Sequence, residues 1–133
     1  MKCKIHEFRK QKNWTLKKLS ELSGVPFNTV WRMEKGYGTA LKNAYKIANV
    51  FKTTIYEMWE ITASGVAFEV HGKVISVSEL RSRRGWALSE LAKLSGVSKT
   101  TLFLIESGHT PTLQNAVKLA TVFGVSVYQI WRF

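Results

Sequence analysis

The side chains that most often carry catalysis or bind metals are few in this chain and lie far apart. Its one cysteine is Cys3, and its three histidines are His6, His71 and His109. This spacing matches no metal-ligand set, and the chain has no nucleophile–base arrangement, phosphate-binding glycine loop or paired-carboxylate motif. We therefore expect a protein that is not an enzyme and that uses no metal and no cofactor. A lone cysteine also excludes an internal disulfide, as is typical of a reducing compartment.

Positive charge is the strongest chemical feature of the composition. The 133 residues include 20 Lys and Arg but only 9 Asp and Glu, for a net charge of +11. This balance favours an anionic partner, usually nucleic acid, although a soluble protein can also simply be basic. Residues 1–60 hold 12 basic and 5 acidic side chains, whereas residues 61–133 hold 8 and 4. The sequence lacks both a membrane-length apolar run and a signal peptide, so we expect a cytoplasmic protein with no membrane partner.

One sequence unit occurs twice. When the chain is shifted against itself by 72 residues, segments 8–60 and 80–132 align without a gap, and 20 of 53 pairs are identical. The shared positions include the Leu-Ser-Gly-Val motif that begins at Leu22 and again at Leu94. Identity at this level over a gap-free alignment indicates one folding unit present in two copies.

Each copy is expected to be all helical. Leu16, Leu19 and Leu22 recur at three-residue spacing and give one helix an apolar face, which Gly24 then terminates. Ser76 followed by Glu79 forms a capping box that places the start of the second copy. The helices predicted for the first copy cover about 4–12, 15–23, 26–35 and 40–51, with a short fifth ending near Trp59. The corresponding helices of the second copy cover about 76–84, 87–95, 98–107 and 112–123, with a fifth ending near Trp131.

Residues 61–75 break this helical pattern. Val66, Phe68 and Val70 alternate with other residues, and His71-Gly72 is a plausible turn, so a small hairpin is compatible with the segment. We interpret it as a short linker that could span roughly 50 Å when fully extended. The predicted architecture is all-α, with tandem five-helix domains at 1–60 and 76–133.

Two helices joined by a short turn with glycine form a helix-turn-helix, whose second helix enters the major groove of DNA. The first copy contains the motifs Leu19-Ser20-x-Leu22-x-Gly24-Val25 and Val30-x-x-Met33-Glu34-x-Gly36. The second contains Leu91-Ala92-x-Leu94-x-Gly96-Val97 and Leu102-x-x-Ile105-Glu106-x-Gly108 at the matching positions. In these motifs both copies resemble the lambda-repressor-like (Cro/XRE-type) family of bacterial and phage regulators, over about 5–60 and 77–132.

The resemblance implies which residues would contact double-stranded DNA. Base edges would be read from the outer face of the third helix, by Phe27, Asn28, Trp31 and Arg32 in the first copy and by Lys99, Thr100, Phe103 and Leu104 in the second. Phosphates would be contacted in the first copy by Thr15, Lys17, Lys35, Tyr37, Thr39 and Lys42. The second copy has Ser89, Ser107, His109, Thr112 and Gln114 at such positions, and none of these carries a fixed positive charge.

The resemblance also implies two structural ion pairs, Arg9 with Glu34 and Arg81 with Glu106. Two departures from the family pattern are visible: Leu16 and Leu88 replace a common glutamine, and Pro26 replaces a Ser or Thr helix cap. Proline is accepted at a helix start but has no side-chain oxygen that could cap it.

We interpret the chain as a sequence-specific transcriptional regulator, with repression as the expected mode. It would act either as a monomer with internal pseudo-symmetry, a covalent pseudo-dimer on an asymmetric operator, or as a homodimer. The alternative is a protein-binding module on the same fold, such as an antitoxin or an inhibitor of a nucleic-acid enzyme. Phe27, Trp31 and Phe103 favour that alternative, because large apolar groups are unusual on an outward helix face.

Overall fold

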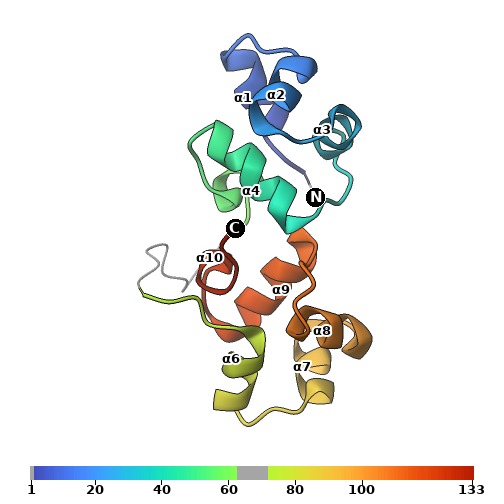
Figure 1. Ribbon diagram of the computed structural model, residues 1–133, viewed down its shortest axis with the longest axis vertical. Coiled ribbons are helices and arrows are strands. Elements are labelled where there is room, and N and C mark those ends of the chain that lie inside the picture. The colour runs from blue at the N-terminus through green and yellow to red at the C-terminus, as the bar shows by residue number, and fades with distance from the viewer. Residues whose placement is uncertain (1, 63–71) are drawn as a thin grey trace. The chain divides into compact units, whose positions relative to one another are not determined.

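The computed structural model describes residues 2–62 and 72–133, which form ten α-helices and no β-strand (Figure 1). This confirms the predicted all-α class with five helices in each copy. The hairpin suggested within 61–75 falls mainly on 63–71, outside the described residues. No helix of the described part is both long and apolar enough to span a membrane. The chain divides into two compact units, of which the first comprises residues up to 62 together with 112–114.

The five helices of the first copy start and end within a residue or so of their expected positions. They are α1 (Ile5–Gln11), α2 (Leu16–Ser23), α3 (Phe27–Glu34), α4 (Leu41–Val50) and α5 (Ile55–Met58). Of the three leucines whose spacing predicted an apolar face on α2, Leu19 is fully inaccessible and Leu16 is half-buried. Leu22 is 46% exposed, so the prediction is wrong for this residue, which lies at the edge of the face. Val30 and Met33 of α3 and Ile47 of α4 are buried with Leu19. Each such side chain contributes about 1.5–3 kcal/mol of burial free energy, so the core faces fix how each helix is rotated.

The second copy repeats the series with the same 72-residue offset. Its helices are α6 (Val77–Arg83), α7 (Leu88–Ser95), α8 (Lys99–Glu106), α9 (Leu113–Phe123) and α10 (Val127–Ile130). The core positions are again apolar, with Leu91, Leu102 and Leu119 fully buried. Ser76 caps α6 as predicted, because its Oγ accepts a hydrogen bond from the Glu79 amide at 3.1 Å.

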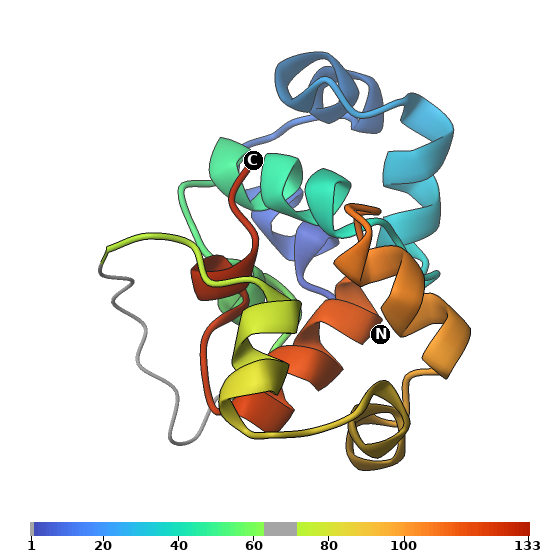
Figure 2. The same cartoon turned by 60° about the horizontal axis from the view of Figure 1, so that its bottom comes forward.

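A tight turn connects the second and third helices in both copies. Gly24 and Gly96 follow α2 and α7 with φ of 76° and 78°, a left-handed conformation that glycine adopts without steric cost. The next residue, Val25 or Val97, is buried and anchors the turn. In the first copy the Ser20 hydroxyl also donates to the Val25 carbonyl oxygen at 2.6 Å. Turning the chain this sharply leaves one face of α3 and one of α8 on the outside of each unit (Figures 1 and 2).

Candidate nucleic-acid interface

The outer face of α3 carries all four side chains predicted to read bases in the first copy. Phe27, Asn28, Trp31 and Arg32 are exposed, whereas Val30 and Met33 on the opposite face are buried. Phe27 and Trp31 expose 47% and 43% of their surface, too much for core residues. The structure therefore brings an amide, a guanidinium and two aromatic rings together on one accessible helix face.

Two cations of the first unit lie over aromatic rings at the end of this helix. The Arg32 guanidinium carbon is 4.7 Å from the centre of the Tyr37 ring, and the Lys35 Nζ is 5.7 Å from the centre of the Trp31 ring. Both distances lie within the range of a favourable cation–π interaction, worth about 0.5–1 kcal/mol at an exposed site. Each pairing restricts a long cationic side chain and leaves its hydrogen-bond donors available to a ligand.

The phosphate-contact candidates of the first copy are exposed, with one exception. Lys17, Lys35 and Lys42 reach solvent, and Tyr37 exposes 52% of its surface. Thr15 caps α2, since its Oγ1 accepts from the Lys18 amide at 3.0 Å. Thr39 is only 8% exposed, which makes it the least accessible candidate.

The outer face of α8 is chemically different from that of α3. Lys99 and Thr100 at its start are exposed, as are Phe103 at 60% and Leu104 at 40%. Ser89 and Ser107 are exposed too, but they contribute hydroxyl groups only. This face thus has one fixed cation at its start and an apolar pair farther along.

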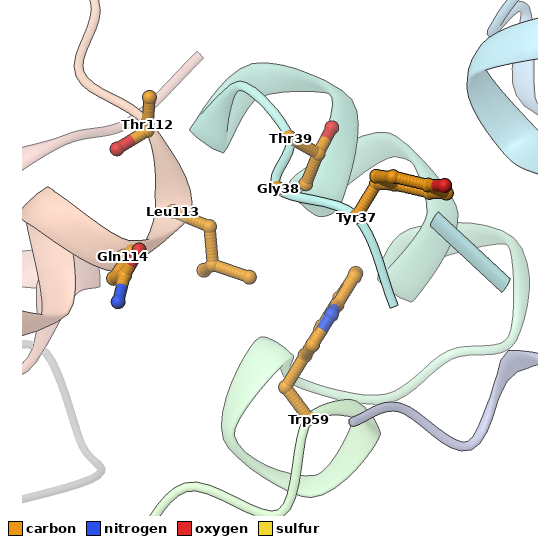
Figure 3. A pocket seen from close by; sticks show the side chains of 7 residues that line it. All are labelled: Tyr37, Gly38, Thr39, Trp59, Thr112, Leu113 and Gln114. Carbon is orange, nitrogen blue, oxygen red and sulfur yellow. The ribbon is translucent and has the colours of Figure 1, made fainter. Parts of the chain in front are cut away.

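Thr112 and Gln114 belong to the first compact unit, although they were predicted as contacts of the second copy. Both are exposed, and both line a pocket of that unit together with Tyr37, Thr39 and Trp59 (Figure 3). The structure therefore groups them with the loop after α3 and not with Lys99 and Thr100.

Arg9 and Glu34 form the ion pair expected between α1 and the end of α3. Arg9 Nη2 donates to Glu34 Oε1 at 2.9 Å, and Arg9 Nη1 donates to the Trp14 carbonyl oxygen at 2.8 Å. His6, which the sequence did not single out, places its Nδ1 2.5 Å from the same Glu34 oxygen. Burial raises the pKa of Glu34, but the hydrogen bonds from Arg9 and His6 lower it by more, so the net pKa lies below its ordinary value of 4.5.

The second copy makes the same connection with a different geometry. Arg81 donates to Glu106 through two nitrogens, Nε to Oε2 at 3.1 Å and Nη2 to Oε1 at 3.0 Å. Its Nη1 donates to the Trp86 carbonyl oxygen at 2.7 Å. With this fork-to-fork pairing, each of the three guanidinium nitrogens has a hydrogen-bond acceptor. In the first copy, Arg9 Nε and Glu34 Oε2 are buried without a hydrogen-bond partner.

The two departures from the family pattern have local structural consequences. Leu16 and Leu88 are half-buried, and neither can make the hydrogen bonds of a glutamine. Pro26 precedes α3 without a side-chain cap, whereas Ser98 caps α8 by accepting from the Thr101 amide at 3.2 Å. Ala87 likewise leaves α7 without the cap that Thr15 gives to α2.

The sequence is also similar to known helix-turn-helix proteins. The helix-turn-helix family model matches residues 5–58 and again 77–130. Two uncharacterized HTH-type transcriptional regulators of Archaeoglobus fulgidus are 42% and 38% identical over 60 residues, covering 44% of this chain and 84% and 86% of theirs.

A third relative is longer. The HTH-type transcriptional regulator SutR of Escherichia coli K12 is 43% identical over 51 residues, 38% of this chain and 29% of SutR. No solved structure matches the chain significantly. Because the family model covers most of the sequence in two copies, and because both copies have the helix order and turn described above, the chain belongs to the Cro/XRE-type helix-turn-helix family as a tandem member.

Proposed function

We propose that the protein is a sequence-specific regulator of transcription that binds double-stranded DNA with both helix-turn-helix units, as a covalent pseudo-dimer on an asymmetric operator. The family and the names of the curated relatives support the general part, a DNA-binding transcriptional regulator. The observation that supports sequence-specific binding is the outer face of α3, where Asn28 and Arg32 are exposed. Asn can pair with two atoms of an adenine edge and Arg with two of a guanine edge.

The mode of action that fits this architecture is repression by occupancy of a promoter. Related single units bind half-sites about 34 Å apart as dimers, and here one chain carries both units. The outer faces of α3 and α8 differ at every base-reading position, so the two half-sites are expected to differ as well. The predicted boundaries, 1–60 and 76–133 with a linker at 61–75, place one such unit on each side of the linker.

Selection of bound duplexes from a random DNA library, followed by binding across a salt series, tests this proposal. With about six phosphate contacts, affinity for the selected duplex should fall roughly a thousandfold between 50 and 200 mM salt. Enrichment of one motif with two unlike half-sites is the expected result. A library with no enriched motif, or an affinity that does not change with salt, contradicts the proposal.

The charged rim of the first unit can be tested with a charge-matched pair of variants. The K17Q/K35Q/K42Q variant removes three proposed phosphate contacts, so the salt slope of log affinity should become shallower by about 2.7. The control variant K2Q/K46Q/K52Q removes the same charge from positions outside the proposed interface. Equal changes in slope for both variants would show that only net charge matters.

A second function is favoured by the apolar exposure of the recognition helices. Phe27, Trp31, Phe103 and Leu104 expose 40–60% of their surfaces, which is more typical of a protein-binding site than of a solvated helix face. A protein-binding module, for example an antitoxin or an enzyme inhibitor, could use them and still repress its own operon. The F27A/W31A variant distinguishes the two functions. If the protein is a protein-binding module, this variant should lose its protein partner and keep its affinity for duplex DNA.

A further inference from the structure

The turn that follows the recognition helix has the same backbone hydrogen bond in both copies but carries different side chains. In the first copy the Tyr37 amide donates to the Arg32 carbonyl oxygen at 3.0 Å, and in the second the His109 amide donates to the Leu104 carbonyl oxygen at 3.0 Å. This hydrogen bond brings the residue at each turn beside the last outward residue of the helix. The pair so formed is Arg with Tyr in one unit and Leu with His in the other.

In the first unit this pair places a cation over an aromatic ring. The Arg32 guanidinium carbon lies 4.7 Å from the centre of the Tyr37 ring, although both side chains are exposed. An exposed arginine otherwise samples many rotamers, and immobilising it on binding costs about 0.5–1.5 kcal/mol. A guanidinium stacked on a ring keeps its in-plane N–H donors free, and their fork matches the O6 and N7 acceptors of guanine.

In the second unit the corresponding side chain has no donor. Leu104 is 40% exposed and Phe103, beside it, is 60% exposed. The His109 ring cannot stack under a cation there, and its Nδ1 instead lies 3.1 Å from the Leu104 carbonyl oxygen. The apolar group that the major groove offers to such a surface is the C5-methyl group of thymine.

We propose that this paired position sets the difference between the two half-sites: Arg32, positioned by Tyr37, selects guanine, whereas Leu104 with Phe103 selects thymine through its 5-methyl group. The inference rests on the proposed function, because it names the bases read by two surfaces proposed to bind DNA. Tyr37 is a positioning residue in this scheme, acting through its ring face and not through its hydroxyl group.

Base analogues in the selected duplex test the two halves of the proposal separately. Replacing the guanine with 7-deazaguanine removes the N7 acceptor, so it should lower the affinity of the wild-type protein roughly tenfold or more. The affinity of R32L should hardly change. Replacing thymine with uracil in the other half-site removes the methyl group and should weaken binding about fourfold for each methyl contacted. The F103A/L104A variant should be insensitive to uracil.

Two substitutions of Tyr37 separate a stacking role from a phosphate contact. Y37F keeps the ring and should retain the discrimination between guanine and 7-deazaguanine, whereas Y37L should reduce it severalfold. If the hydroxyl group instead contacts a phosphate, Y37F would weaken binding to every duplex equally and the positioning role would be wrong.

A transplant of the pair provides the decisive variant. L104R/H109Y builds the Arg–Tyr pair into the second unit, and repeated selection should then enrich guanine in place of thymine in the second half-site. Circular dichroism melts verify that each variant is folded. If the wild-type protein enriches no duplex, both the proposed function and this inference are wrong. Enrichment of a duplex whose bases are unaffected by R32L, by uracil or by the transplant overturns the inference and leaves the proposed function standing.

Discussion

His6 has no counterpart among the ion-pair residues of the second copy. It joins the Arg9–Glu34 pair through Glu34 Oε1, and the first copy is left with two buried atoms that lack partners. The second copy has Ser78 at the corresponding position, and there Arg81 engages both oxygens of Glu106. Arg81 and Glu106 thus pair through two parallel hydrogen bonds, whereas in the first unit Arg9 and His6 share one oxygen of Glu34.

The acidic partner of each pair should be important for stability. The Arg side chains are 13% and 20% exposed and the Glu side chains 11% and 13%, so removing one charge leaves its partner poorly solvated. We expect E106Q to lower the free energy of unfolding by about 3 kcal/mol, measured by urea unfolding at pH 7. E79Q provides the control, because Glu79 pairs with Arg83 where both side chains are more than half exposed. Equal losses in the two variants would contradict a structural role for the buried pair.

The lowered pKa of Glu34 predicts a specific dependence of stability on pH. A carboxyl group whose pKa is lower in the folded protein than in the unfolded chain stabilises the fold fully above the unfolded value of 4.5. That contribution is lost as the pH falls below 4.5 and through the folded pKa. The stability difference between wild type and E34Q should therefore shrink on acidification from pH 6 to pH 3. Urea unfolding at several pH values measures it, and a difference that stays constant over this range would contradict the lowered pKa.

At the scale of the helices, the two copies distribute their caps in opposite ways. Thr15 caps α2 but Ala87 leaves α7 uncapped, whereas Ser98 caps α8 but Pro26 leaves α3 uncapped. In each helix-turn-helix, one helix therefore begins without a side-chain acceptor for the free backbone amides of its first turn.

These caps predict a graded series of stabilities. A87T should raise the free energy of unfolding by about 1 kcal/mol, because the extended backbone at 87 suits a cap like Thr15. P26S should change it by less than about 0.5 kcal/mol, since the cap gained is offset by the loss of proline's restriction on the unfolded chain. S98A should lower it by about 1 kcal/mol. Thermal or urea unfolding measures all three, and a gain from P26S as large as that from A87T would contradict this explanation.

The helices were predictable from the sequence because their signals are local. Leucine spacing, Gly24 and the Ser76 cap each act within one helix or one turn, and the repeat supplied each boundary twice. His6 could not be predicted, because its contact with Glu34 joins residues 28 apart and Ser78 in the other copy gives no matching signal. The contact of Lys35 with the Trp31 ring could have been predicted from the sequence, because residues four apart on a helix lie on the same face. Which residues contact DNA stays a prediction.

At the scale of the whole molecule, the two units differ in what they offer to an anionic partner. The outer surface of the first combines Lys17, Lys35 and Lys42 with hydrogen-bonding groups on α3, whereas α8 has one lysine at its start and apolar side chains beyond it. Electrostatic attraction sets sequence-independent affinity, and base contacts set specificity. The first unit should therefore supply most of the affinity, and the second should add specificity for one half of the operator.

A comparison of two duplexes tests whether the units cooperate through their covalent connection. Binding of one unit makes the second contact intramolecular, which raises overall affinity without any new contact. The K99A/F103A variant should therefore bind the complete operator at least tenfold more weakly than wild type, measured by fluorescence anisotropy. On a duplex that contains only the first half-site, the same variant and the wild type should bind equally well. N28A/R32A serves as the counterpart and should lose affinity on both duplexes. If K99A/F103A instead weakened binding to both duplexes by the same factor, the second unit would be supporting the first rather than reading DNA itself.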